Sequence, residues 1–286
     1  MMANCIIAFP NRFDEAALSS GSWTAALPLA NLQNRILAKL ARSTDAANAS
    51  TKFDTALTKS RTVKVVAVIN HNLSAAALFR IRGADVSNFS VLLYDSGWIA
   101  AWPALYATLS LEWEDDNWWD GKMLDEDKTG YTWSLIHILP AATIARYWRI
   151  EFDDTTNAAG YVQAGRVFTA GQWQPVVNMS YGLSLGWETD TKTDKALGGA
   201  EYFDPRKAWR VARFNLDWMS IDEALGRAFE IDRRAGIDQE VLYIFDPADT
   251  VHMIRRAFIG RLRQLSPIEY PYLNTMRKAY EIKELI

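Results

Sequence analysis

The sequence predicts a mainly β protein in two parts, an N-terminal jelly-roll-like β-sandwich and a C-terminal α+β module formed by an antiparallel sheet or small barrel with one helix. Two observations predict this fold class. The first 175 residues are short apolar runs separated by Asn, Asp, Ser, Gly and Pro, as in strands joined by turns. Residues 179–286 contain one amphipathic helical segment between strand-like segments. We therefore expect domains over residues 1–178 and 179–286.

The strongest strand signal of the N-terminal part is residues 61–70. Valine, alanine and isoleucine occupy both faces of this segment, which is typical of a central strand. The alternation of such runs with turn residues favours a jelly-roll arrangement. Further strands are expected over residues 77–82, 89–94, 146–152 and 160–169.

The C-terminal module is predicted to begin with a strand over residues 209–218. Its period of two places Ala212, Phe214, Leu216 and Trp218 on the buried face. Three or four further strands are expected after the helix, within residues 240–245, 252–260, 262–268 and 275–283. Residues 189–199 are polar and predict a hinge or an exposed loop.

A helix is predicted over residues 221–235. Ser220 and Glu223 have the spacing of a capping box, in which the serine hydroxyl accepts from the Glu223 N–H and the glutamate reaches back to the Ser220 N–H. Gly236 is placed as the glycine that ends the helix.

Composition excludes several classes of protein. A net charge of −3 and a pI near 5.7 argue against nucleic acid as a partner, because phosphate binding needs clustered Lys and Arg. Cys5 is the one cysteine, which excludes an intramolecular disulfide and a thiolate zinc site. We see no signal peptide and no apolar run of about 20 residues, so we expect no membrane insertion and assembly in a cytoplasm.

Residues 98–128 form a long segment without periodicity that holds five of the 12 tryptophans and a run of acidic residues. Such segments are usually functional, and we expect an interaction loop. Aromatic side chains are enriched in subunit interfaces, which we favour over stacking on sugar rings. The predicted interaction residues are Trp98, Trp102, Trp113, Glu114, Asp115, Asp116, Trp118 and Trp119, with Arg255, Arg256, Arg261 and Arg263 of the C-terminal strands as their electropositive counterpart.

No catalytic residue, metal site or cofactor is predicted. Gly182-Leu-Ser-Leu-Gly186 matches the serine-hydrolase pattern, but no helix signal follows Ser184, so we expect a strand or loop there. His71, His137 and His252 are too widely spaced for a zinc motif, and His71 is expected to bond local backbone in a turn.

The acidic run of residues 112–128 leaves two chemical alternatives open. Carboxylates suit Ca²⁺, but Trp119 stands where a calcium loop needs an oxygen ligand, so a solvated acidic face is favoured. A pair of carboxylates is also what a glycoside hydrolase uses, with Glu112 and Glu114 as candidates. We expect a protein that is not an enzyme.

Two sets of residues in the N-terminal part resemble the discoidin or galactose-binding-like β-sandwich. They are the run Val63-Lys-Val-Val-Ala-Val-Ile-Asn-His-Asn-Leu-Ser74 and the late pair of segments 145–150 and 160–168. This resemblance is the basis of the alternative function, a carbohydrate-binding adsorption protein that recognises glycan on a host surface.

The whole chain resembles minor tail proteins of long-tailed bacteriophages, of the tail-tip, baseplate or distal-tail type. Residues 113–119, 198–203, 233–238 and 281–285 are similar to theirs. The resemblance implies a structural component of the virion tail tip that forms a ring with copies of itself. Its further partners would be other tail and baseplate proteins, and it would connect the tail tube to them.

Overall fold

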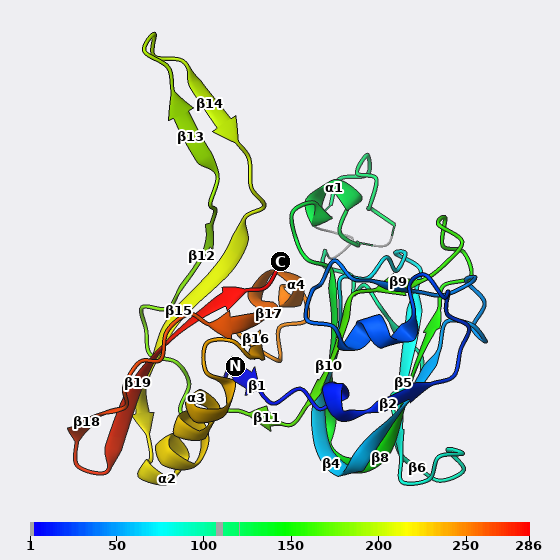
Figure 1. The fold of residues 1–286 in the computed structure, drawn as a ribbon, viewed down its shortest axis with the longest axis horizontal. Helices are drawn as coiled ribbons and strands as arrows, with labels where there is room; N and C mark the ends of the chain where they lie inside the picture. Colours follow the sequence, from blue (N-terminus) through cyan, green and yellow to red (C-terminus); the bar gives the residue numbers. More distant parts are fainter. Residues whose placement is uncertain (1–2, 107–110, 120) are drawn as a thin grey trace.

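The computed structural model describes residues 3–106, 111–119 and 121–286. The predicted mainly β fold with one principal helical segment is confirmed, and every pairing between its named strands is antiparallel (Figure 1). The seven-stranded sheet contains β2 (Ala17–Ser19), β4 (Phe53–Ile69), β5 (Leu78–Ala84), β6 (Leu92–Asp95), β7 (Ile99–Ala100), β8 (Ser134–Asp153) and β10 (Arg166–Ala170).

A second, eight-stranded sheet contains both ends of the chain. Its members are β1 (Ile6–Ala8), β11 (Gln172–Trp173), β12 (Ser184–Glu188), β15 (Trp209–Met219), β16 (Glu240–Ile244), β17 (Ala257–Leu262), β18 (Glu269–Tyr272) and β19 (Thr275–Glu284). Two small pairs are β3 (Ala41–Arg42) with β9 (Gln163–Ala164) and β13 (Lys192–Lys195) with β14 (Glu201–Asp204). The helices are η1 (Phe13–Glu15), η2 (Leu29–Gln33), α1 (Asp125–Lys128), α2 (Ile221–Glu223), η4 (Ala224–Ala228), α3 (Phe229–Ala235) and α4 (Met253–Arg256).

Strand β4 is buried on both faces, as its sequence predicts. Val66 and Val68 belong to the core of the N-terminal part, where they join Phe53, Trp148 and Ile150. The intervening side chains of β4 point the other way, into a second apolar layer. One strand therefore contributes to two cores at once.

That second layer lies between the two large sheets. On one side are Val65, Ala67 and Ile69 of β4, all fully buried. On the other are apolar residues of β1, β16 and β17, including Ile6 and Ile244. Strand β1 pairs with β16, so a strand from the start of the chain completes the sheet built mainly by its last hundred residues.

A buried ion pair flanks this layer. The Arg166 guanidinium on β10 is fully buried and donates from Nε to both carboxylate oxygens of Glu240 on β16, each at 3.1 Å. Asp14 is a second partner at 2.6 Å, and Asn11 donates to Glu240 at 2.7 Å. The pair joins the two sheets through charge-assisted hydrogen bonds.

The helix predicted over residues 221–235 is confirmed as the continuous run α2, η4 and α3, with η4 a π-helical turn. The Ser220 hydroxyl accepts from the Glu223 N–H at 3.2 Å, and Gly236 ends the helix with a φ of 55°. The second predicted hydrogen bond of the capping box, from the Ser220 N–H to the Glu223 carboxylate, is wrong. The Glu223 carboxylate instead accepts from the Trp173 indole at 3.0 Å and from the Val176 N–H at 3.1 Å.

Strand β15 departs from its predicted alternation at its end. Ala212, Phe214 and Leu216 are buried as predicted. Between Leu216 and Met219 the register with β19 shifts, so Met219 is buried and Trp218 is 57% exposed. A bulge adds one residue to a strand and reverses the faces that follow, which explains the wrong prediction for Trp218.

The strand predicted over residues 252–260 is partly wrong. Residues Met253–Arg256 form the short helix α4, and β17 begins at Ala257. Asp249 starts this turn by accepting from the His252 N–H at 3.0 Å. Most of the strand predicted over residues 262–268 is irregular, because β17 ends at Leu262 and β18 begins at Glu269.

The segment predicted as a polar hinge or loop is a β-hairpin. We name residues 192–204 the arm; it consists of β13, β14 and their turn, and it projects from the body beyond β12 and β15 (Figure 1). The turn is closed by the Ala196 N–H, which donates to Ala200 O at 2.9 Å. Gly199 in this turn has a φ of 86°, which favours glycine.

We expect Arg166→Ala to lower the free energy of unfolding by about 3 to 5 kcal/mol, because it leaves the Glu240 carboxylate buried without its cation. Urea unfolding followed by circular dichroism measures this change. Arg233→Ala is the matched control, since it breaks an exposed ion pair with Glu230, and its midpoint should stay near that of the parent. Equal midpoints for the two variants would contradict a role for Arg166 in joining the sheets.

Candidate functional site

The five tryptophans of residues 98–128 do not form one group. Trp113, Trp118 and Trp119 contact one another edge to face, with ring centroids 4.7 to 6.0 Å apart. We name these three residues the Trp cluster. Trp113 is 70% and Trp119 80% exposed, whereas Trp118 is half-buried. The cluster therefore presents aromatic surface to solvent, as binding of a sugar or of a protein requires.

Trp102 has a different role from the one predicted. It is buried, and its indole N–H donates to Leu73 O at 2.9 Å. Its ring lies 5.5 Å from those of His71 and Trp133. Trp102 thus anchors the start of the segment to the N-terminal core. Trp98 is 43% exposed and lies outside both groups.

The acidic residues next to the Trp cluster face solvent. Glu114, Asp115 and Asp116 are exposed, and the Asp115 carboxylate accepts from the Glu112 N–H at 2.9 Å. In the part of the chain that the structure describes, no group of three His, Cys, Asp or Glu side chains is placed to hold a metal ion. Asp120, which belongs to the same acidic run, lies outside the described residues.

The four predicted arginines do not form one patch. Arg255 and Arg256 lie on α4 rather than on a strand, whereas Arg261 lies near the end of β17 and Arg263 directly follows it. Four residues of β17 lie between Arg256 and Arg261, a span of about 16 Å of strand. Arg256 pairs with Asp249 at 3.1 Å, so part of this charge is compensated within the chain.

Arg263 is also compensated within the chain. Its guanidinium pairs with Glu188 at 2.8 Å and with Glu281 at 3.0 Å. Arg213 pairs with the same two carboxylates, which makes a network across β12, β15 and β19. The pKa of Glu188 is lowered by these arginines, chiefly by its hydrogen bond to Arg213.

His71 and Ser184 are placed as the sequence predicts, whereas His252 precedes a short helix and does not open a strand. His71 is buried in a turn and accepts from the Leu73 N–H at 3.3 Å, and burial lowers its pKa to about 3. His137 contacts the Tyr94 hydroxyl at 2.6 Å, and His252 lies beside α4. Ser184 opens strand β12 and is exposed, without the strand-to-helix turn that a nucleophilic serine needs.

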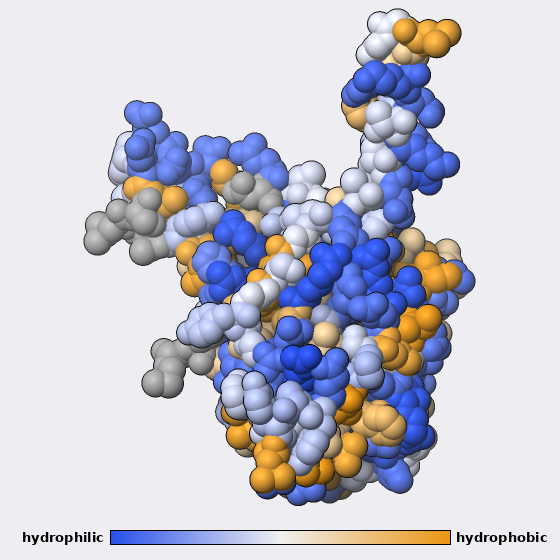
Figure 2. Space-filling view, turned by 90° about the vertical axis from the view of Figure 1, so that its left-hand side faces the viewer, coloured by the Kyte–Doolittle hydropathy of each residue, from blue (hydrophilic) through white to orange (hydrophobic). Residues whose placement is uncertain are grey.

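The arm is the surface feature that sequence reasoning missed. Every residue of the arm is exposed, and hydrophobic side chains lie at its far end (Figure 2). Leu197 is fully exposed, and Tyr202 and Phe203 are 65% and 62% exposed. Gly198-Gly199 followed by the aromatic pair Tyr202-Phe203 is a hairpin signal that the polar composition of the segment obscured.

The residues that flank the arm, which we call its base, lie against residues that directly follow the segment with the Trp cluster. Trp187 contacts Tyr131 with ring centroids 5.3 Å apart. Lys207, on the other side of the hairpin, donates to the Thr132 hydroxyl at 3.4 Å. Both exposed features therefore rise from the same end of the molecule (Figure 1).

No family model and no curated protein matches this sequence. None of the described helices is long and apolar enough to cross a membrane.

Several solved structures share a distant likeness with the chain. A variant of the lectin-binding domain of lectinolysin complexed with Lewis b has a TM-score of 0.39 at 13% identity, over 57% of this chain and 97% of that one. The family 32 CBM from C. perfringens NanJ in complex with galactose has a TM-score of 0.38 at 11% identity, over 58% and 99%. A Streptococcus pneumoniae fucose-binding module has a TM-score of 0.36 at 14% identity, over 56% and 94%.

These neighbours are carbohydrate-binding β-sandwich domains, of the type that the N-terminal part resembles in sequence. At such TM-scores the likeness carries no argument about function. These comparisons give no support to the tail-protein resemblance, which stays a hypothesis.

We expect Trp102→Ala to destabilise the protein by about 3 to 5 kcal/mol, because it removes a buried ring and leaves a cavity. Trp119→Ala is the control and should cost less, about 1 kcal/mol, since its ring is 80% exposed and makes edge-to-face contacts within the Trp cluster. Thermal unfolding of both variants measures the difference. A larger loss for Trp119→Ala would show that the two rings have been assigned the wrong roles.

Proposed function

We propose that this chain is a structural, non-catalytic subunit of a larger assembly, and that the arm is its main contact with neighbouring subunits. The observation that carries this proposal is the exposure of the whole arm, residues 192–204. The body of the protein is built without it, because its residues belong to none of the apolar cores.

An isolated two-stranded hairpin is marginally stable in water, because it has no sheet or helix to cover its apolar side chains. Leu197, Tyr202 and Phe203 are left uncovered on this hairpin. Burying them against a second protein removes apolar surface from water at about 25 cal/mol per Å². The hairpin therefore gains most of its stabilisation when a partner covers it.

The backbone of the arm supports the same conclusion. Among the described residues, β13 and β14 pair only with each other, so each strand has one edge with unpaired N–H and C=O groups. Such edges accept an added strand from another chain. The ion pair between Lys195 and Glu201 at 3.3 Å stabilises the hairpin itself and leaves both edges available.

The assembly that the sequence resemblance suggests is the tail tip or baseplate of a long-tailed phage. In this proposal copies of the chain form a ring, and other tail proteins are the further partners. The virion tail tip is then where the protein resides. The exposed tryptophans and the arm rise from one end of the molecule, which suits a single contact region with a neighbour.

A second candidate function is glycan binding, and the Trp cluster is the observation that favours it. Trp113 and Trp119 expose most of their rings, and Glu114 and Asp116, which lie between them in the sequence, are exposed as well. Aromatic faces cover the C–H groups of a sugar, and carboxylates accept hydrogen bonds from its hydroxyls. In this function the chain recognises glycan on a host surface.

We expect the double change Leu197→Ser and Phe203→Ser to weaken self-association of the full chain roughly tenfold or more, as loss of central apolar contacts does. Sedimentation velocity over a range of concentrations measures this. Leu273→Ser is the control, because Leu273 is 83% exposed and lies outside the arm. The proposal fails if the parent chain stays monomeric, or if the double variant associates as strongly as the parent.

For glycan binding, we expect Trp119→Ala to abolish any reproducible signal of the full chain on a glycan array. Trp98→Ala should keep it, since Trp98 is exposed but lies outside the Trp cluster. A parent chain that binds no glycan, or a signal unaffected by Trp119→Ala, rejects this second function and leaves the assembly proposal intact.

A further inference from the structure

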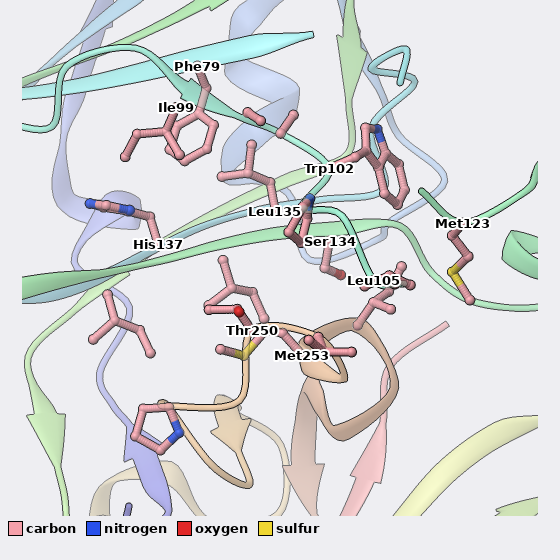
Figure 3. A pocket seen from close by; sticks show the side chains of 18 residues that line it. Phe79, Ile99, Trp102, Leu105, Met123, Ser134, Leu135, His137, Thr250 and Met253 are labelled. Atoms are coloured by element: carbon pink, nitrogen blue, oxygen red, sulfur yellow. The ribbon is translucent and has the colours of Figure 1, made fainter. Parts of the chain in front are cut away.

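An apolar pocket lies between the seven-stranded sheet and the segment that joins β16 to β17. Its volume is about 270 Å³. One wall is formed by β5, β7 and β8, with Phe79, Ile99 and Leu135. The opposite wall is residues 247–254, which include Met253 of α4. The two walls face each other across the space (Figure 3).

The pocket is elongated. The labelled side chains run from His137 at one end to Trp102 and Met123 at the other (Figure 3). An engineered apolar cavity of about 150 Å³ holds a benzene ring, so the volume here is sufficient for a longer molecule. Because this volume is nearly twice that of the benzene-binding cavity, the pocket suits a linear chain of about eight carbons.

The chemistry of the walls restricts what this pocket can hold. None of the described residues that line it is charged. Its polar side chains include Ser134, whose hydroxyl already donates to Thr132 O at 3.1 Å, and His137, whose Nε2 contacts the Tyr94 hydroxyl at 2.6 Å. Burial lowers the pKa of His137, so the imidazole is neutral at pH 7 and supplies no cation for an anionic group.

We propose that this pocket is a binding site for a small, uncharged, predominantly aliphatic molecule. Apolar pockets of this kind between two packed parts of a protein are common ligand sites. A bound chain contacts Phe79 and Leu135 on one wall and Met253 on the other, so it links the seven-stranded sheet to the segment that leads into β17. This inference does not depend on the proposed assembly function.

The ligand is expected to be uncharged because a charged group would lose its water on entering the pocket. A carboxylate buried in this pocket would lose its water without gaining a cation or a set of hydrogen-bond donors, which is strongly unfavourable. A hydroxyl needs one partner, and the Thr250 side chain that lines the pocket supplies one. An aliphatic alcohol therefore fits where a fatty acid of the same length does not.

The test uses the full chain with ¹³C-labelled methionine methyl groups and 1-octanol as the probe. We expect saturable shifts of the Met123 and Met253 methyl resonances, because both residues line the pocket. Met219 is the internal control, since it is buried in the core beside the helix and should not respond. Octanoate should bind at least tenfold more weakly.

Three outcomes of the titrations with the parent chain overturn the proposal. They are the absence of saturable shifts at Met123 and Met253, equal shifts at Met219, and octanoate binding as tight as that of octanol. A blocking variant, Val251→Trp, places a large ring at the wall and should reduce the octanol response tenfold or more. Val86→Trp, at an exposed site away from the pocket, is its control and should respond as the parent does. Retention of the response in Val251→Trp also overturns the proposal.

Discussion

The apolar layer between the two large sheets is the contact on which the other features of the molecule depend. Strand β4 supplies side chains to this layer from one face and to the N-terminal core from the other. Because interiors are close-packed, the position of one sheet then determines that of the other. The buried pair of Arg166 and Glu240 adds directional bonds at the edge of the same layer, and both ions are satisfied only when the sheets are packed together.

The packing of the two sheets also fixes the positions of the arm and the Trp cluster. The arm continues β12 and β15 beyond the body, while the segment with the Trp cluster leaves the N-terminal part and returns to it at Tyr131 and Thr132. These two residues contact the base of the arm. The Trp cluster and the arm therefore rise from the same end of the molecule, although Lys192, where the arm begins, follows Trp119 by 73 positions in the sequence. The apolar pocket lies between the seven-stranded sheet and residues 247–254, and each of them forms one wall.

Local sequence patterns predicted some elements correctly and failed at others. The two-faced strand β4, the helix after Ser220 and the turn at His71 were predictable, because each follows from local periodicity or from a short-range hydrogen bond. Trp218 was not, since a bulge within one strand reverses the faces beyond it. Trp102 and Trp119 belong to the same aperiodic segment, and the burial of Trp102 follows from a contact with Leu73, outside that segment.

By itself, the sequence determined the strand-rich class, the helix and its ends, and the absence of a disulfide within the chain, because these depend on local patterns and on counting. Only the tertiary structure decided which tryptophans are exposed, which arginines are already paired, and where the arm and the pocket lie. Those properties depend on long-range pairing such as β1 with β16 and Arg263 with Glu188. A local pattern indicates which residues favour burial, whereas the packing of distant segments determines which of them are buried or paired.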